Sequence, residues 1–302
     1  MTPFPRNATD EPRYLTQGPS VGYPVVEAWS DEYIRFPPRP PWQEVLRGEI
    51  DSRCSYLVPS ADQVLSATFA GPKPSNADIE NLALYNLEAF RNCGRNGIRF
   101  EHGSTVPAAP SGTQYQFHYR YSLEQRSAPF GHWQTGRMLG SFDWVDLGAL
   151  VRDITTAKVW LALVRSELHY VEQVRAAETP FAVAVDVRPP QGGREPRPDL
   201  LMKAIFDGTI SAFQAHTDRA VVADVASRLA TVLPARAAEI EEHLLDHRRA
   251  VLGQVPQLVR PQGRAGVWNP ADHLCVAGQL FPARPSGQCW AIRGRMFEVY
   301  RG

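Results

Sequence analysis

A short stretch, RPDLLMKAIFDG at residues 197–208, spaces its charged residues in a way that could do chemistry. Asp199, Lys203 and Asp207 lie four residues apart, so on a helix all three project from one face. Lys203 is one of only three lysines in a chain with 29 arginines. A structural explanation is an N-cap aspartate, worth about 1 kcal/mol, followed by two ion pairs. Carboxylates beside an ammonium group also suit phosphoryl chemistry, in which they hold a metal ion and stabilise developing charge.

A further acidic residue, Asp218, lies eleven positions after Asp207, in the segment HTDRAVVADV. We expect this segment to begin a strand beside another strand at 181–187. Asp199 and Asp218 would then point into one small space, where two carboxylates repel each other unless a cation lies between them. Hard oxygen ligands of this kind suit Mg²⁺ or Mn²⁺. We therefore expect Asp199 and Asp218 to be metal ligands.

The elements predicted around these residues place the acidic helix after a strand. We expect a long helix at 146–177, the strand FAVAVDV at 181–187, and a loop, RPPQGGREPRP, at 188–198. A helix then begins at Asp199, and another is predicted at 234–252.

These residues resemble the motif of the RusA-type Holliday-junction resolvases, which runs approximately PDxDNxxKxxxD on a helix and then DDxxVV on a strand. Asp199, Lys203 and Asp207 match the first part, and TDRAVV matches the second with Asp218 as its second acid. The resemblance covers about residues 181–225. The sequence departs from the motif at three positions: Arg197 and Thr217 replace acids, and Leu200 replaces the asparagine.

The resemblance implies a homodimeric endonuclease that cleaves branched DNA with Mg²⁺ or Mn²⁺. Carboxylates would hold the metal, and Lys203 would stabilise charge in the transition state. Arg188, Arg194 and Arg197 on the preceding loop would contact phosphates of DNA or another nucleic acid.

The first half of the chain repeats the pattern. NADIENLALYN carries Asp78 and Glu80 followed by Asn81, close to the D-x-D-N order of the family. The stretch follows a predicted strand, QVLSATFAG, and a proline-containing loop. A helix at about 78–92 then leads to the strand IRFEH, which contains Glu101. We expect Asp78 and Glu80 to belong to the catalytic group, and the chain to be a pseudo-dimer of two diverged copies.

The expected fold is α+β or mixed α/β, with two similar strand-helix-strand halves and helical insertions. We expect a proline-rich arm at 1–41, the first half at 42–145, the second half at 146–252, and a Pro/Gly/Arg-rich segment with short strands at 253–302.

Three alternatives stay open. The protein could be a diverged, inactive relative that binds nucleic acid. It could also be a non-enzymatic binding or scaffold subunit that captures a protein partner through its N-terminal arm and an aromatic strand. That strand, TQYQFHYRYSL, is predicted to be half-buried. His243 and His247 have the spacing of a zinc or iron pair, but a solvated helix face explains both histidines without a metal.

Composition and missing motifs narrow the functional classes to which the protein could belong. The net charge is zero, unlike the basic domains typical of nucleic-acid binding. No P-loop, GxGxxG, GxSxG or HExxH motif occurs, which argues against common nucleotide-binding and serine-hydrolase classes. The four cysteines form no CxxC pair, so we expect free thiols. The sequence contains neither an apolar leader nor a membrane-length apolar run, so we expect a cytoplasmic protein without membrane contact.

Overall fold

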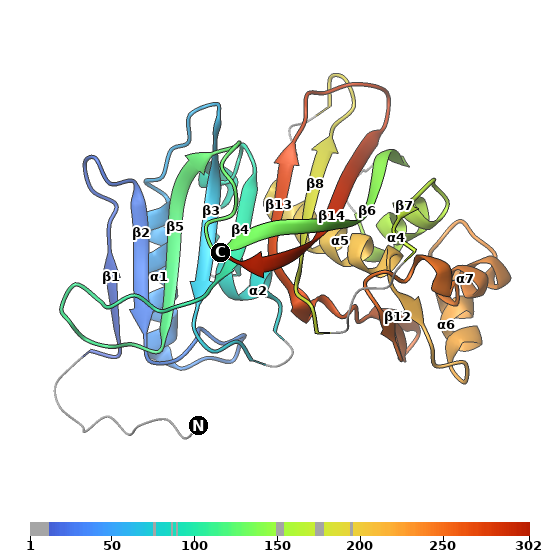
Figure 1. Ribbon diagram of the computed structural model, residues 1–302, viewed down its shortest axis with the longest axis horizontal. Helices are drawn as coiled ribbons and strands as arrows, with labels where there is room; N and C mark the ends of the chain where they lie inside the picture. The colour runs from blue at the N-terminus through green and yellow to red at the C-terminus, as the bar shows by residue number, and fades with distance from the viewer. Residues whose placement is uncertain are drawn as a thin grey trace.

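A ten-stranded mixed sheet runs through the part of the chain that the structure describes (Figure 1). The structure is a computed structural model, and it describes residues 12–74, 77–85, 87–88, 90–148, 154–172, 178–193 and 196–302. The strands of the sheet are β1 (Tyr14–Gln17), β2 (Val25–Ser30), β3 (Gln63–Ala70), β4 (Ile98–Gly103), β5 (Phe117–Gln125), β6 (Trp133–Gly148), β7 (His169–Tyr170), β8 (Phe181–Arg188), β13 (Cys275–Pro282) and β14 (Trp290–Arg301). The fold is therefore mixed α+β, as expected from the sequence.

The strand order has the same pattern on both sides of the sheet centre. The order is β1-β2-β5-β3-β4-β13-β8-β14-β6-β7. In the first half β2 pairs antiparallel with β5, β5 antiparallel with β3, and β3 parallel with β4. In the second half β6, β14, β8 and β13 repeat these three relations in the same order. The two halves meet where β4 pairs antiparallel with β13.

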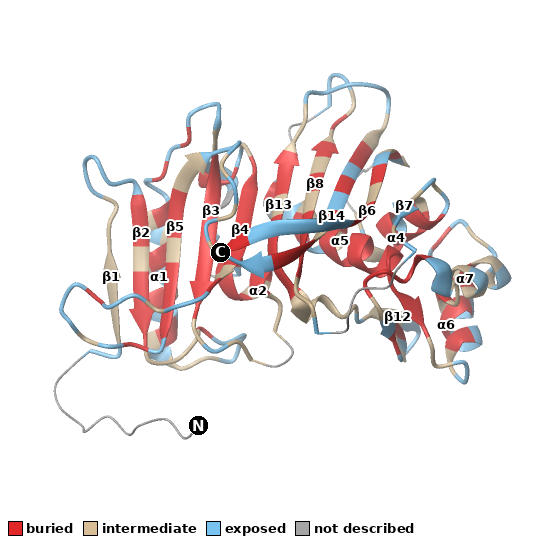
Figure 2. Cartoon of the chain, viewed as in Figure 1, coloured by how far each residue is buried: buried red, intermediate tan, exposed pale blue. Residues whose placement is uncertain are grey.

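The main helices pack on one face of this sheet. They are α1 (Pro41–Cys54), α2 (Ile79–Leu84), α3 (Phe90–Cys93), α4 (Thr156–Val164) and α5 (Pro198–Ala212). Apolar residues of α1, α2, α4 and α5 join those of both sheet halves in one buried cluster. Figure 2 shows this burial running along the central strands. Burial of one continuous apolar layer couples the two halves energetically.

A long insertion separates α5 from β13. It contains β9 (Ala215–His216), α6 (Val222–Leu229), α7 (Ala237–Leu244), β10 (Gln254–Val255), β11 (Val259–Gln262) and β12 (Ala265–Trp268). These elements gather beyond α4 at one end of the molecule (Figure 1). No helix among the described residues is both long enough and apolar enough to cross a membrane.

The arm and the long helix expected from the sequence differ from the structure. Within the proposed arm at 1–41, β1 and β2 are strands of the sheet, and residues 1–11 lie outside the described residues. Burial of Val26 and Ala28 in the core and the pairing of β2 with β5 explain why this proline-rich region still forms strands. The helix expected at 146–177 is wrong in its extent, because β6 continues to Gly148 and α4 covers only Thr156–Val164. Residues 149–153 and 173–177 of that prediction lie outside the described residues.

Three further boundaries are corrected. The segment around Asp218 leads into helix α6 instead of a strand, because Val222, Val225, Ala226 and Leu229 recur with a helical period and are all buried. The helix expected at 78–92 is divided into the short helices α2 and α3. The helix expected at 234–252 ends at Leu244, and a 3₁₀ turn follows at 247–249.

The aromatic strand is β5, and it is buried on both faces for much of its length. Phe117, Tyr119 and Tyr121 belong to the core, with Tyr119 and Tyr121 fully buried. On the other face His118 is also buried and lies 3.2 Å from a carboxylate oxygen of Glu27. These aromatic side chains therefore offer no docking surface in the folded protein.

Candidate functional site

Lys203, on α5, lies at the centre of four carboxyl groups. Its Nζ atom is 2.9 Å from Asp78 Oδ2, 3.3 Å from Glu80 Oε1, 2.9 Å from Asp207 Oδ1 and 3.5 Å from Asp272 Oδ2. We call these five residues the Lys203 cluster. Asp78 and Glu80 come from the first half of the chain, and the other three come from the second. The cluster therefore joins the two halves.

The sheet topology explains why residues so distant in sequence meet. Because β4 and β13 are antiparallel, the carboxyl end of β3 lies at the same edge of the sheet as the amino end of β13. Asp78 caps α2 soon after β3, and Asp272 lies just before β13. The middle of α5 passes over this edge and supplies Lys203 and Asp207.

The four carboxyl groups are not equivalent electrostatically. Burial raises the pKa of Glu80 to about 8 and that of Asp272 to about 8, despite the nearby ammonium group. Burial also raises the pKa of Asp207. Burial acts in the same direction on Asp78, but hydrogen bonds from Asp272 and Lys203 outweigh it and lower the Asp78 pKa. Burial alone would lower the Lys203 pKa, but the surrounding carboxylates together raise it.

Neighbouring groups hold the first-half acids in place. Asn81 Nδ2 donates a hydrogen bond of 2.7 Å to Asp78 Oδ2, so the D-x-E-N order orients the first acid. Lys73, on the loop before α2, donates to the backbone oxygen of Ala77 at 3.1 Å and interacts electrostatically with Asp78 and Asp272. Two of the three lysines in the chain therefore lie near the same acidic group.

Two cavities open onto the Lys203 cluster from different sides. One, of about 480 Å³, is lined by Asp78, Lys203, Asp207 and Asp272 together with residues of the insertion, including Gln254, Trp268 and His273. The other, of about 580 Å³, is lined by Glu80 and Lys203 together with Arg47, Asn81, Tyr85 and Glu88. A ligand can therefore reach the charged groups, and the insertion forms much of one wall.

The donor chemistry of the cluster fits a hard divalent cation. Carboxylate oxygens are the ligands that Mg²⁺ and Mn²⁺ prefer, and four of them surround one point here. Burial is the largest cause of the two pKa values near 8, and repulsion from neighbouring carboxylates adds to it. Among the described residues, however, no three Asp, Glu, His or Cys side chains already form a ligand set, and the Lys203 ammonium occupies the centre. Cation binding would require that ammonium to move.

The structure brings together four of the six residues that the sequence suggests for catalysis: Asp78, Glu80, Lys203 and Asp207. Asp218 is elsewhere, because the strands beside β8 are β13 and β14, and Asp218 precedes α6. Its carboxylate accepts hydrogen bonds from Ala220 N at 3.1 Å and Gln257 Nε2 at 2.9 Å. The expected pairing of Asp199 and Asp218 is therefore not supported, and the side chain of Asp199 lies outside the described residues.

Asp272 is the residue that the sequence argument missed. Asp272 lies three residues before β13, the strand that pairs parallel with β8. The signal that could have found it is an acid just before the apolar run LCVAGQLF. The insertion of α6, α7 and β9–β12 hid this relation in the linear sequence.

Of the three arginines expected to contact phosphates, Arg188 makes its contacts away from the Lys203 cluster. The guanidinium group of Arg188 lies 4.5 Å from the ring centroid of Trp144 and 3.9 Å from Asp146. Arg197 is exposed at the N-cap of α5, and Arg194 lies outside the described residues.

The two histidines suggested as a metal pair have different surroundings. His247 is exposed on the 3₁₀ turn, whereas His243 is half-buried against Trp160, and its Nδ1 lies 3.3 Å from Arg249 Nη2. The helix ends at Leu244, so the i, i+4 spacing does not place the two rings on one helix face.

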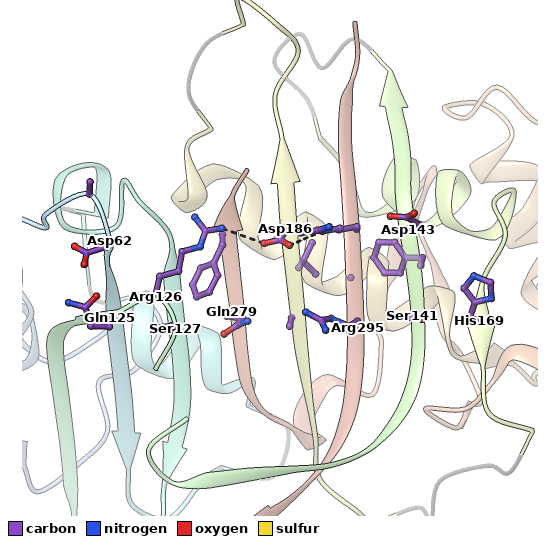
Figure 3. A pocket seen from close by; sticks show the side chains of 17 residues that line it. Asp62, Gln125, Arg126, Ser127, Ser141, Asp143, His169, Asp186, Gln279 and Arg295 are labelled. Atoms are coloured by element: carbon purple, nitrogen blue, oxygen red, sulfur yellow. Dashed lines mark hydrogen bonds and ion pairs between the residues drawn. The ribbon is translucent and has the colours of Figure 1, made fainter. Parts of the chain in front are cut away.

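A separate groove of about 1050 Å³ lies on the face of the sheet opposite the helices. Asp186 forms ion pairs with Arg126 at 3.5 Å and with Arg293 at 2.9 Å, and Figure 3 shows Arg126 pointing toward it. Gln279 and Arg295 line the same groove from the strands on either side of β8. No residue of the Lys203 cluster lines this groove, so the acidic centre is a different site.

Comparison with known proteins adds no relative to this description: no protein-family model, curated protein or solved structure matches the chain.

Proposed function

We propose that this protein is a RusA-like, divalent-cation-dependent endonuclease that acts on branched DNA through the Lys203 cluster. The observation that carries the proposal is the meeting of Asp78 and Glu80 from one half with Lys203, Asp207 and Asp272 from the other. Each half alone departs from the motif, but together they supply acids at four of its five acidic positions, its asparagine and its lysine. The substitutions at Arg197, Leu200 and Thr217 therefore leave this composite site intact.

Each residue of the cluster has a role that follows from its position. Asp78, Glu80 and Asp272 would hold Mg²⁺ or Mn²⁺, which when bound polarises a phosphoryl oxygen and lowers the pKa of water. Asn81 keeps Asp78 oriented through its hydrogen bond. Lys203, which is about half exposed, is long enough to move toward a phosphate group and stabilise its developing negative charge. Asp207 contacts the Lys203 ammonium group from the next turn of α5 and would orient it.

The test is cleavage of synthetic four-way junctions, forks and flaps in Mg²⁺ and in Mn²⁺. Asp78→Asn and Glu80→Gln should abolish cleavage while leaving DNA binding intact, because they remove cation ligands and reduce repulsion of phosphate. Lys203→Ala should slow cleavage by about 10²-fold, comparable to the loss of one transition-state donor. Asp218→Asn is the matched control and should cleave at the wild-type rate. Wild-type protein that is inert toward all three substrates with both cations would exclude the proposal.

One observation favours a second candidate function. The Lys203 ammonium occupies the centre of the carboxyl groups, as a built-in cation would. The protein would then be a non-cleaving nucleic-acid-binding relative, in which Lys203 replaces the metal. Mn²⁺ titration separates the two functions. The enzyme binds Mn²⁺ as wild type, whereas the non-cleaving relative binds Mn²⁺ only after Lys203→Ala removes the ammonium group.

A further inference from the structure

The strand pairing relates the two halves of the sheet by an internal two-fold axis, which lies where β4 pairs with β13. The register of β3 with β4 and of β8 with β13 makes Ile98 and Gly278 equivalent, if Leu65 corresponds to Val183. Those four residues are all buried on the helix side of the sheet. The relation places the pairing of Arg99 with Gln279 at the centre of the sheet. Any composite site on one side of this centre has an equivalent position on the other side.

Counting residues from the N-caps of α2 and α5 identifies the residues at this second position. Asp78 is the N-cap of α2 and Arg197 is the N-cap of α5, so an arginine takes the place of the first acid. Lys203 lies six residues after its N-cap, and the residue six positions after Asp78 is the buried Leu84. The second position therefore lacks both the first acid and the lysine.

Of the remaining positions, that of Glu80 keeps an acid, Asp199, two residues after the α5 N-cap, and the other acids are missing or engaged elsewhere. Asp272 precedes β13, but the segment RNCGRNG that precedes β4 contains no acid. Glu88, the counterpart of Asp207 by spacing from the N-cap, forms an ion pair with Arg47 on α1. Glu101 on β4 faces the opposite side of the sheet, where its carboxylate accepts hydrogen bonds from the backbone nitrogens of Gly131 and His132 at 3.0 and 2.8 Å. A cation at this second position would meet an arginine and have few oxygen ligands.

We propose that the chain carries one competent site and one degenerate site, and that it therefore makes a single-strand incision in a branched duplex. This inference rests on the proposed endonuclease function. A symmetric homodimer presents two identical sites and can cut two strands within one complex. In this protein the DNA strand at the degenerate site is held without being cut, because Arg197 can pair with a phosphate but cannot bind a cation.

The test is the first product formed from a supercoiled plasmid with an inverted repeat that extrudes a cruciform. One protein chain per DNA should be confirmed by light scattering. The expected first product in Mg²⁺ is a nicked circle, and linear DNA should appear only later through a second binding event. Glu80→Gln should remove the nick, which identifies the composite site as its source. Linear DNA as the first product would overturn the inference while leaving the endonuclease function standing.

Cation stoichiometry gives a second readout that does not depend on cleavage. Equilibrium binding of Mn²⁺ should saturate at one tight site per chain, and Glu80→Gln should remove that site. Two sites of equal affinity would overturn the inference. Absence of both Mn²⁺ binding and cleavage would instead remove the proposed function on which the inference rests.

Discussion

At the scale of single residues, the surroundings of Lys203 explain why this position carries a lysine in a chain with 29 arginines and three lysines. An ammonium group is a compact charge with three donors, so it can contact carboxylates in several directions, whereas a guanidinium group is planar. Lys203 contacts four carboxyl groups that come from α2, α5 and the segment before β13. Two of these groups, Glu80 and Asp272, remain protonated near neutral pH because burial raises their pKa values to about 8.

This protonation predicts how stability depends on pH without divalent cations. Glu80 titrates near 4.5 in the unfolded chain and near 8 in the folded protein. Between these values the folded state binds more protons, so the free energy of unfolding should fall as pH rises from 5 toward 8. Glu80→Gln should make that decline less steep. Urea denaturation in EDTA at a series of pH values measures the free energy of unfolding of the wild type and of Glu80→Gln. If that free energy falls equally with pH in both proteins, the pKa assignment is contradicted.

Asp272 provides a second prediction at this scale. Asp272→Asn removes one potential cation ligand but retains a group that can hydrogen-bond to Asp78. We expect weaker Mn²⁺ binding and a higher Mg²⁺ requirement for cleavage, with little loss of folding stability. Calorimetric titration of Mn²⁺ is the measurement, and Asp218→Asn is the control with unchanged affinity. Equal effects of the two substitutions would show that Asp272 has no special role.

At the scale of elements, the close crossing of α4 and α5 positions the lysine. Gly208 lies one turn after Lys203 on α5, and a Cβ atom added there would lie 2.6 Å from the Cβ of Val159 on α4. Glycine therefore allows the two helices to approach, although it costs helix stability of roughly 0.5 to 1 kcal/mol relative to alanine. The position of Lys203 and Asp207 over the sheet edge depends on this contact.

A matched pair of glycine substitutions tests this role. Gly208→Ala should destabilise the protein, because overpacking costs about 1 to 3 kcal/mol and exceeds the gain in helix propensity. Gly48→Ala, on the open side of α1 where nothing lies within 4 Å, should stabilise the protein by about 0.5 to 1 kcal/mol. Thermal unfolding of both variants gives the comparison. Stabilisation by both substitutions would mean that α4 and α5 can separate without cost.

At the scale of the whole molecule, the two halves form one folding unit. The pairing of β4 with β13 continues the sheet across them, and one apolar cluster extends over both. A fragment containing residues 12–125 would expose the open edge of β4 and the apolar face that the second half covers. We expect that fragment to be unfolded or aggregated, and the intact chain to unfold in one transition. Circular dichroism and amide NMR dispersion of the fragment test this, and a well-dispersed native spectrum would contradict it.

Local sequence pattern determined the individual strands and the candidate acids of this protein. The apolar runs at 63–70 and 181–188 and the segment IRFEHG at 98–103, in which apolar and polar residues alternate at first, form strands of the sheet. Apolar side chains gain stability when they enter the core. The D-x-E-N order of residues 78–81 and the position of Lys203 in the motif also follow from local pattern alone. These features depend on neighbours within about ten residues, which the sequence contains directly.

Only the tertiary structure decided which acids meet. Asp218 follows Asp207 by eleven residues but faces Gln257, whereas Asp272 follows by 65 residues and lies 3.5 Å from Lys203. The difference arises because β13, beyond a long insertion, is the strand that pairs with both β8 and β4. Which strands pair depends on how the whole sheet is buried, so the hydrophobic periodicity of a local segment does not determine it. The carboxyl groups around Lys203 are therefore a property of the assembled sheet.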